Sequence, residues 1–134
     1  MRNDLHTYIL EQVKDNVIKS LTSLHGEQTY TDQDLLRILF KNYRIKNGEH
    51  NGLLLTYFGH RALARVFDCY SYQINFQDKT KKMKKTKHST LIALDKNMKW
   101  PYYIGKKYVT FFSEDDASWF RLSGSDINDF SGYV

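Results

Sequence analysis

Residues 56–67 have the sequence TYFGHRALARVF, which predicts an amphipathic helix that begins after a capping Thr56. At 100° per residue, one side of this helix is mainly apolar. That side carries Phe58, Gly59, Ala62, Leu63, Val66 and Phe67. The other side carries Tyr57, His60, Arg61, Ala64 and Arg65. We therefore expect the helix to bury one face in a core and to expose two arginines on the other.

A first, longer helix is predicted between Leu5 and Leu24, where apolar residues recur at steps of three and four. Gly26 is placed to end this helix. The apolar residues are Ile9, Leu10, Val13, Val17, Leu21 and Leu24.

A second helix is predicted from about Thr31 to Tyr43, because Thr31 and Asp34 have the spacing of a capping box. Its apolar stripe consists of Leu35, Leu36, Leu39, Phe40 and Tyr43. The dipeptides Asn47-Gly48 and Asn51-Gly52 predict an exposed connection after it. Leu53–Leu55 then forms either a short buried strand or a lead-in to the helix at 56–67.

Downstream of that helix, residues 69–76 (CYSYQINF) alternate in polarity and predict a half-buried strand. Tyr70, Tyr72, Ile74 and Phe76 fall on one side of it. Thr90–Leu94 predicts another short strand. The residues between these two runs are therefore expected at the tip of an antiparallel pair.

That tip contains the most basic part of the chain, KTKKMKKTKH at residues 79–88, here called the basic segment. Its six lysines exceed the whole net charge of +5, and without them 14 bases face 15 acids. Such concentrated charge indicates a segment that seeks a polyanion, although a solvated loop without a partner has the same composition. The lysines are Lys79, Lys81, Lys82, Lys84, Lys85 and Lys87.

The last part of the chain predicts an aromatic hairpin and a helix. The runs Trp100–Ile104 and Lys107–Phe112 flank a Gly105-Lys106 turn, and Pro101 requires that the first run lie at an edge or begin at the proline. Ser113 and the acids Glu114, Asp115 and Asp116 predict a helix start. This helix is expected to end at Gly124, with one more turn from Ser125 to Phe130.

The predicted fold is a single α+β domain over residues 1–134. Residues 1–94 form a winged-helix-like part, with the basic segment as the wing, and residues 95–134 form a hairpin and helix packed on it. The first residues lack the apolar run of a signal peptide or membrane span. We therefore expect a cytoplasmic protein without membrane contact.

Catalysis, metals and cofactors are not expected. The single cysteine, Cys69, excludes an intramolecular disulfide and a multi-cysteine zinc site, and the five histidines have no metal-ligand spacing. Five carboxylates near the C-terminal helix could in principle hold metal for phosphodiester cleavage. They are Glu114, Asp115, Asp116, Asp126 and Asp129. Helix capping explains the first three more simply, so we predict a protein that is not an enzyme.

The predicted function is noncatalytic nucleic-acid binding, with duplex DNA favoured over RNA. The six lysines would contact phosphates, while Tyr57, Arg61 and Arg65 would orient or read the duplex. Two arginines on a polar face also serve simply to keep a helix soluble. The aromatic hairpin with Lys106 and Lys107 could stack unpaired bases, although alternating aromatics more often form core.

The alternative function is a protein-binding module that inhibits or redirects a host protein, with the aromatic hairpin as its anchor. The acidic C-terminal third, opposed to the basic middle, also favours head-to-tail self-association, for instance as a homodimer, or docking on a basic partner.

Two segments, Leu55–Gly59 continuing to Leu63 and Phe67, and Leu94–Tyr102, resemble patterns in small uncharacterised proteins of tailed bacteriophages. The resemblance covers about residues 51–130. It implies a context rather than an activity, namely a protein made in an infected bacterial cytoplasm that regulates transcription or inhibits a host system.

Overall fold

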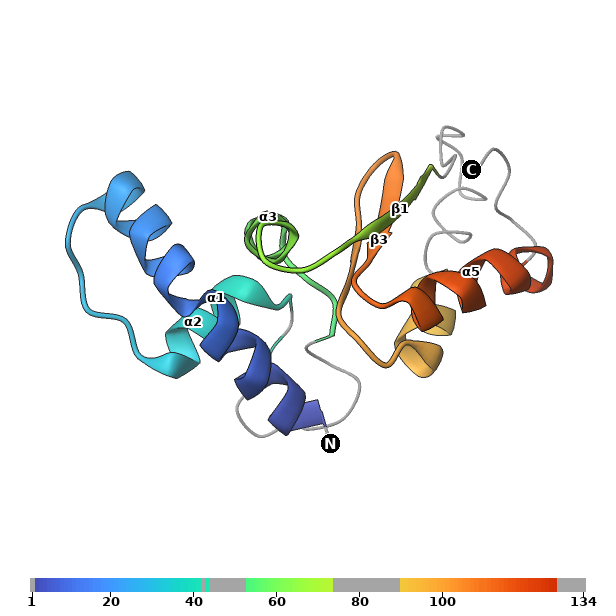
Figure 1. The fold of residues 1–134 in the computed structure, drawn as a ribbon, viewed down its shortest axis with the longest axis horizontal. Coiled ribbons are helices and arrows are strands. Elements are labelled where there is room, and N and C mark those ends of the chain that lie inside the picture. Colours follow the sequence, from blue (N-terminus) through green and yellow to red (C-terminus); the bar gives the residue numbers. More distant parts are fainter. Residues whose placement is uncertain (1, 42, 44–52, 74–89, 128–134) are drawn as a thin grey trace. The chain divides into compact units, whose positions relative to one another are not determined.

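The computed structural model describes residues 2–41, 43, 53–73 and 90–127 (Figure 1). The chain divides into two compact units, Met1–Phe67 and Asp68–Val134, and each is described by itself. The first unit is helical, and the second contains a small antiparallel sheet with helices. The chain is therefore of mixed α and β structure, as predicted, while the prediction of one continuous domain stays a prediction.

In the first unit, helix α1 (Arg2–His25) buries the predicted apolar face. Ile9, Leu10, Val13, Val17 and Leu21 are all buried. Leu24 is the exception among the predicted core residues of α1, because its side chain is 66% exposed.

The end of α1 is formed by a glycine, as predicted. Gly26 has φ +79°, and its amide donates to the carbonyl oxygen of Thr22 at 2.9 Å. This left-handed conformation is one that glycine adopts without steric cost.

Helix α2 (Asp32–Leu39) begins with the predicted capping box. The Asp34 amide donates to Thr31 Oγ1 at 3.1 Å, and the Thr31 amide donates to Asp34 Oδ2 at 3.0 Å. The hydrogen bond from the Thr31 amide to the charged carboxylate, with a contribution from the Thr31 side chain, holds the pKa of Asp34 below its usual value.

The predicted end of α2 near Tyr43 is wrong. Phe40 is already extended and pairs antiparallel with Leu55, and the Lys41 amide donates to the Leu54 carbonyl at 2.6 Å. Helix α2 therefore ends at Leu39, because the backbone of the next residues pairs with Leu54 and Leu55 instead of continuing the helix. Leu53 and Leu55 are buried, in agreement with a short buried strand or lead-in.

Helix α3 (Tyr57–Ala64) begins after Thr56, as predicted, but ends three residues before Phe67. Gly59, Ala62 and Leu63 are buried and Phe58 is half-buried. Val66 lies beyond the helix in a turn, where both its amide and that of Phe67 donate to the Leu63 carbonyl. Its side chain is exposed because it has left the helical pattern that placed it in the core.

Thr56 and Gly59 join α3 to the end of α2. The Thr56 amide donates to the Leu39 carbonyl at 3.0 Å, and its hydroxyl donates to the Ile38 carbonyl at 2.5 Å. The same hydroxyl accepts from the Gly59 amide at 2.9 Å. The backbone of Gly59 approaches Leu39 so closely that a Cβ would overlap the Leu39 carbonyl.

In the second unit, three short strands pair antiparallel in the order β1-β3-β2. They are β1 (Tyr70–Gln73), β2 (Tyr102–Ile104) and β3 (Tyr108–Phe111). β1 has the predicted alternation, with Tyr70 and Tyr72 half-buried and the residues between and after them exposed. The continuation of the predicted strand to Phe76 lies outside the described residues.

The predicted strand at Thr90–Leu94 is wrong, because residues 90–97 are helical. Thr90, Leu94 and Met98 are buried at four-residue steps, and the Met98 amide donates to the Leu94 carbonyl. β1 pairs instead with β3, from Tyr70 opposite Phe111 to Gln73 opposite Tyr108. The described residues on either side of the basic segment, β1 and residues 90–97, are therefore not paired strands.

The predicted hairpin is confirmed as β2 and β3, closed by the Gly105 amide donating to the Tyr108 carbonyl at 2.8 Å. β2 is an edge strand that begins directly after Pro101, as the proline requires. Helix α5 (Glu114–Ile127) follows Ser113, as predicted. It continues through Gly124, where the prediction ended it, because one helical glycine costs only about 1 kcal/mol.

Aromatic rings form the core of the second unit. Phe111 of β3 and Phe120 of α5 are fully buried, with ring centroids 5.1 Å apart, and the Tyr72 ring lies 5.7 Å from Phe120. Among the described residues of this unit, the other largest buried side chains are Tyr102, Leu94 and Met98. Half of the predicted hairpin aromatics therefore serve packing.

Asp116 fixes the first turn of α5 to the segment before β2. Its side chain is 3% exposed, and its carboxylate accepts from the Lys99 amide at 3.1 and 3.2 Å and from the Trp100 amide at 2.8 Å. Burial raises the pKa of Asp116 above its usual value, although these hydrogen bonds oppose the shift.

We expect Gly59→Ala to lower the free energy of unfolding by about 2 kcal/mol, because the new methyl group meets the backbone of Leu39 rather than a movable side chain. Helix propensity alone predicts the opposite sign, a gain of about 1 kcal/mol. Gly26→Ala, which meets no atom but keeps a positive φ, is the matched control, with an expected loss of about 1 kcal/mol. Urea unfolding measures both. A Gly59→Ala protein at least as stable as wild type contradicts the close approach.

We expect Asp116→Ala to lower the free energy of unfolding by about 2 kcal/mol, because it leaves the Lys99 and Trp100 amides without their acceptor. Asp116→Asn, which keeps one acceptor oxygen, loses less. Because the folded pKa is raised above 3.8, wild type should gain stability relative to Asp116→Asn as the pH falls through the folded pKa toward 3.8. Urea unfolding of both proteins between about pH 7 and pH 3 tests the sign.

Candidate nucleic-acid interface

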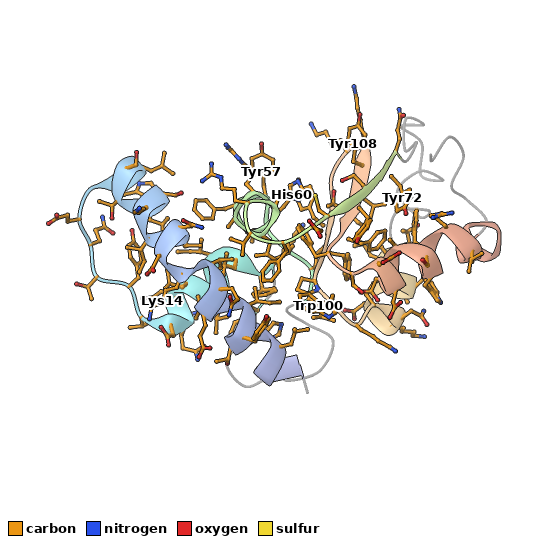
Figure 2. The ribbon with its side chains drawn as sticks, viewed as in Figure 1. Lys14, Tyr57, His60, Tyr72, Trp100 and Tyr108 are labelled. Carbon is orange, nitrogen blue, oxygen red and sulfur yellow. The ribbon has the colours of Figure 1, made fainter. Side chains whose placement is uncertain are left out.

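The exposed face of α3 carries a stripe of three predicted site residues. Tyr57, Arg61 and Arg65 follow one another at four-residue steps, which places them on one side of the helix. All three side chains are exposed, Tyr57 by 62%. The Arg61 guanidinium lies 5.8 Å from the centre of the Tyr57 ring, a distance suited to a cation–π contact. Figure 2 shows Tyr57 projecting outward from α3.

His60 lies on the same helix but is half-buried rather than solvent-facing. Burial lowers its pKa below the ordinary histidine value, because the charged imidazolium is harder to accommodate away from water. This lowering of the pKa favours the neutral form of His60.

Arg61 and Arg65 also line a pocket of about 390 Å³ between α3 and α1, here called the α1–α3 pocket. Helix α3 contributes Phe58 and Ala62 as well, and α1 contributes Asn16, Lys19, Ser20, Ser23 and Leu24. The exposed Leu24 therefore forms part of the pocket wall instead of the core.

The contribution of α1 to this site is missing from the sequence-based prediction. Asn16, Ser20 and Ser23 recur at steps of four and three, so they share one face of α1 beside Lys19. This polar stripe is the signal that could have indicated a site. The pattern does not distinguish a binding site from a solvent-exposed helix face, because both have the same spacing of polar residues.

The six predicted phosphate-binding lysines lie outside the described residues, so the structure does not place them relative to α3. The predicted role of Lys79, Lys81, Lys82, Lys84, Lys85 and Lys87 stays a prediction. Residues 90–97 show that the chain enters a helix soon after the basic segment.

The aromatic hairpin offers a limited stacking surface. Tyr102, Phe111 and Phe112 are buried, whereas Tyr108 is exposed beside Lys106 and Lys107. This burial favours packing over base stacking for half of the hairpin's aromatic residues.

The acidic residues of α5 divide into exposed and buried positions. Glu114 and Asp115 are exposed in the first turn, while Asp116 accepts backbone hydrogen bonds. Among the described residues, no group of three or more histidine, cysteine, aspartate or glutamate side chains could hold a metal ion.

No described helix is long and apolar enough to cross a membrane.

Comparisons with known proteins give no relative from which a role could be transferred. The sequence matches no protein-family model and no curated protein, and the fold matches no solved structure. The functional argument therefore depends on the residues of this chain alone.

Proposed function

We propose that the protein is a noncatalytic nucleic-acid-binding protein that prefers duplex DNA. The observation that carries this proposal is the exposed stripe of Tyr57, Arg61 and Arg65 on α3. An α-helix with its side chains is about 10–12 Å across, which suits a major groove of about 12 Å width. Arginine side chains one turn apart can each make a bidentate contact with guanine or phosphate.

In this proposal α2 and α3 form a helix-turn-helix pair, and α3 is the helix that contacts the groove. The junction at Thr56 and Gly59 supports this role, because it fixes the direction of α3 against α2. The basic segment supplies the phosphate affinity of a wing. Because residues 90–97 are helical, we propose it as a basic loop between β1 and a helix, and not as the tip of a hairpin.

The second candidate is a protein-binding module acting on a host protein, the role that the phage resemblance implies beside transcriptional regulation. Three exposed apolar side chains of the second unit favour it: Ile92 is 45% exposed, Tyr108 52% and Leu122 82%. Large exposed apolar residues are frequent anchors of protein interfaces.

We expect the basic segment to dominate the salt dependence of DNA binding. Fluorescence anisotropy with duplex DNA across a salt series should give a slope of log K against log salt of about −4 to −5, as about five neutralised phosphates require. Replacing the six lysines by glutamine should remove most of this slope. The control replaces Lys106 and Lys107 by glutamine. It should change the slope of log K against log salt by less than about 2. Equal binding by the six-lysine variant and wild type would contradict the phosphate role and favour the protein-binding candidate.

We expect Arg61→Gln combined with Arg65→Gln to weaken duplex binding about tenfold or more at fixed salt, because each lost charged contact contributes about 1–3 kcal/mol. The matched control is Arg37→Gln, which removes a cation from α2 that pairs with Asp34. Its expected effect is under about threefold. Circular dichroism should show that all variants keep their helices. If the α3 variant binds as tightly as the control, the groove-contact role of α3 is wrong.

A further inference from the structure

The α1–α3 pocket brings together three cations from two helices. Arg61 comes from α3, Arg65 is the residue that caps the end of α3, and Lys19 comes from α1. None of the residues that line the pocket is acidic. None of these three cations forms an ion pair with a carboxylate of the described residues. Like charges placed together repel one another. An anion bound in the pocket would offset this repulsion among the three cations.

Two other described cations of the same unit have carboxylate partners. Lys14 of α1 lies 2.9 Å from Asp32, and Arg37 lies 3.4 Å from Asp34. Lys14 and Lys19 are thus two lysines on one helix in different surroundings. Lys14 is neutralised by a neighbouring carboxylate, and Lys19 faces a pocket with two arginines.

The uncharged residues that line the pocket form one polar group and one apolar group. Asn16, Ser20 and Ser23 offer hydroxyl and amide groups that can donate to phosphate oxygens. Leu24, Phe58 and Ala62 form an apolar wall that includes a half-buried aromatic ring. A pocket of about 390 Å³ is larger than a bare phosphate needs and lies within the range of small-molecule sites.

We propose that the α1–α3 pocket binds the phosphate group of a nucleotide, with Lys19, Arg61 and Arg65 contacting the phosphate and Leu24 and Phe58 contacting the base. The nucleotide is either a free mononucleotide or one unit of a nucleic-acid strand. Arginine provides planar, paired donors for phosphate oxygens and lysine a compact charge, so the two residue types act together at such sites. An aromatic ring gives a sequence-tolerant surface for a base.

The test uses the full-length protein and the variants Lys19→Gln, Phe58→Leu and Lys14→Gln. The first two change the cationic and the apolar wall of the pocket, and Lys14→Gln removes the same charge from the same helix outside it. In the first arm, isothermal titration calorimetry measures binding of AMP, of adenosine and of inorganic phosphate. In the second arm, anisotropy measures binding of duplex and single-stranded DNA.

If the pocket takes free nucleotides, AMP should bind more tightly than either adenosine or phosphate, and Lys19→Gln should weaken AMP binding about tenfold. If the pocket takes a unit of a strand, Lys19→Gln and Phe58→Leu should each weaken DNA binding at least about threefold more than Lys14→Gln does. Either result supports the site.

The inference is overturned if Lys19→Gln behaves like Lys14→Gln in both arms. It is also overturned if neither AMP nor DNA binds wild type. Its failure is distinguishable from failure of the proposed function. DNA binding that depends on the basic segment but not on Lys19 removes only the pocket, whereas Lys19-dependent AMP binding without DNA binding removes only the DNA-binding proposal.

Discussion

The Thr56 hydroxyl is the interaction on which the arrangement of the first unit depends. It donates to the last turn of α2 and accepts from the first turn of α3, so one atom joins the end of one helix to the start of the next. Gly59 makes this possible because it lets the two backbones meet without a side chain between them. The face of α3 opposite this contact is therefore fixed as the exposed one. The positions of Arg61 and Arg65 follow from that orientation rather than from any interaction of their own.

Local signals in the sequence predicted the helix starts well. Thr31, Thr56 and Ser113 each precede a helix, and the capping box at Thr31 is present in full. Helix ends were harder to predict, because α2 is ended by pairing between Phe40 and Leu55, a contact between residues distant in sequence. Residues 90–94 contain Thr, Leu and Ile, which suit strands. The helical pattern is the four-residue spacing of the buried residues Thr90, Leu94 and Met98, and Met98 lies outside the short run. Short apolar runs of this kind do not distinguish the two structures.

The candidate site shows the same division. The stripe on α3 was predictable because it follows from helical geometry within one element. The pocket was not, since it needs the packing of α1 against α3, and the polar residues of α1 have no pattern that names a partner. Asp116 is a related case. Its place in an acidic helix start suggested capping, whereas the structure uses it to hold the Lys99 and Trp100 amides.

The pairing of β1 with β3 has a consequence for the order of folding. Ser71 and Thr110 share a hydrogen bond although 39 positions separate them along the chain. Contacts this distant form late, because a long loop must close first, whereas neighbouring helices form from local contacts. During synthesis, the helices of the first unit can therefore assemble while β1 still lacks its partner. Of the two cores that the structure describes, the aromatic core around Phe111 and Phe120 is then the later one to be protected from water.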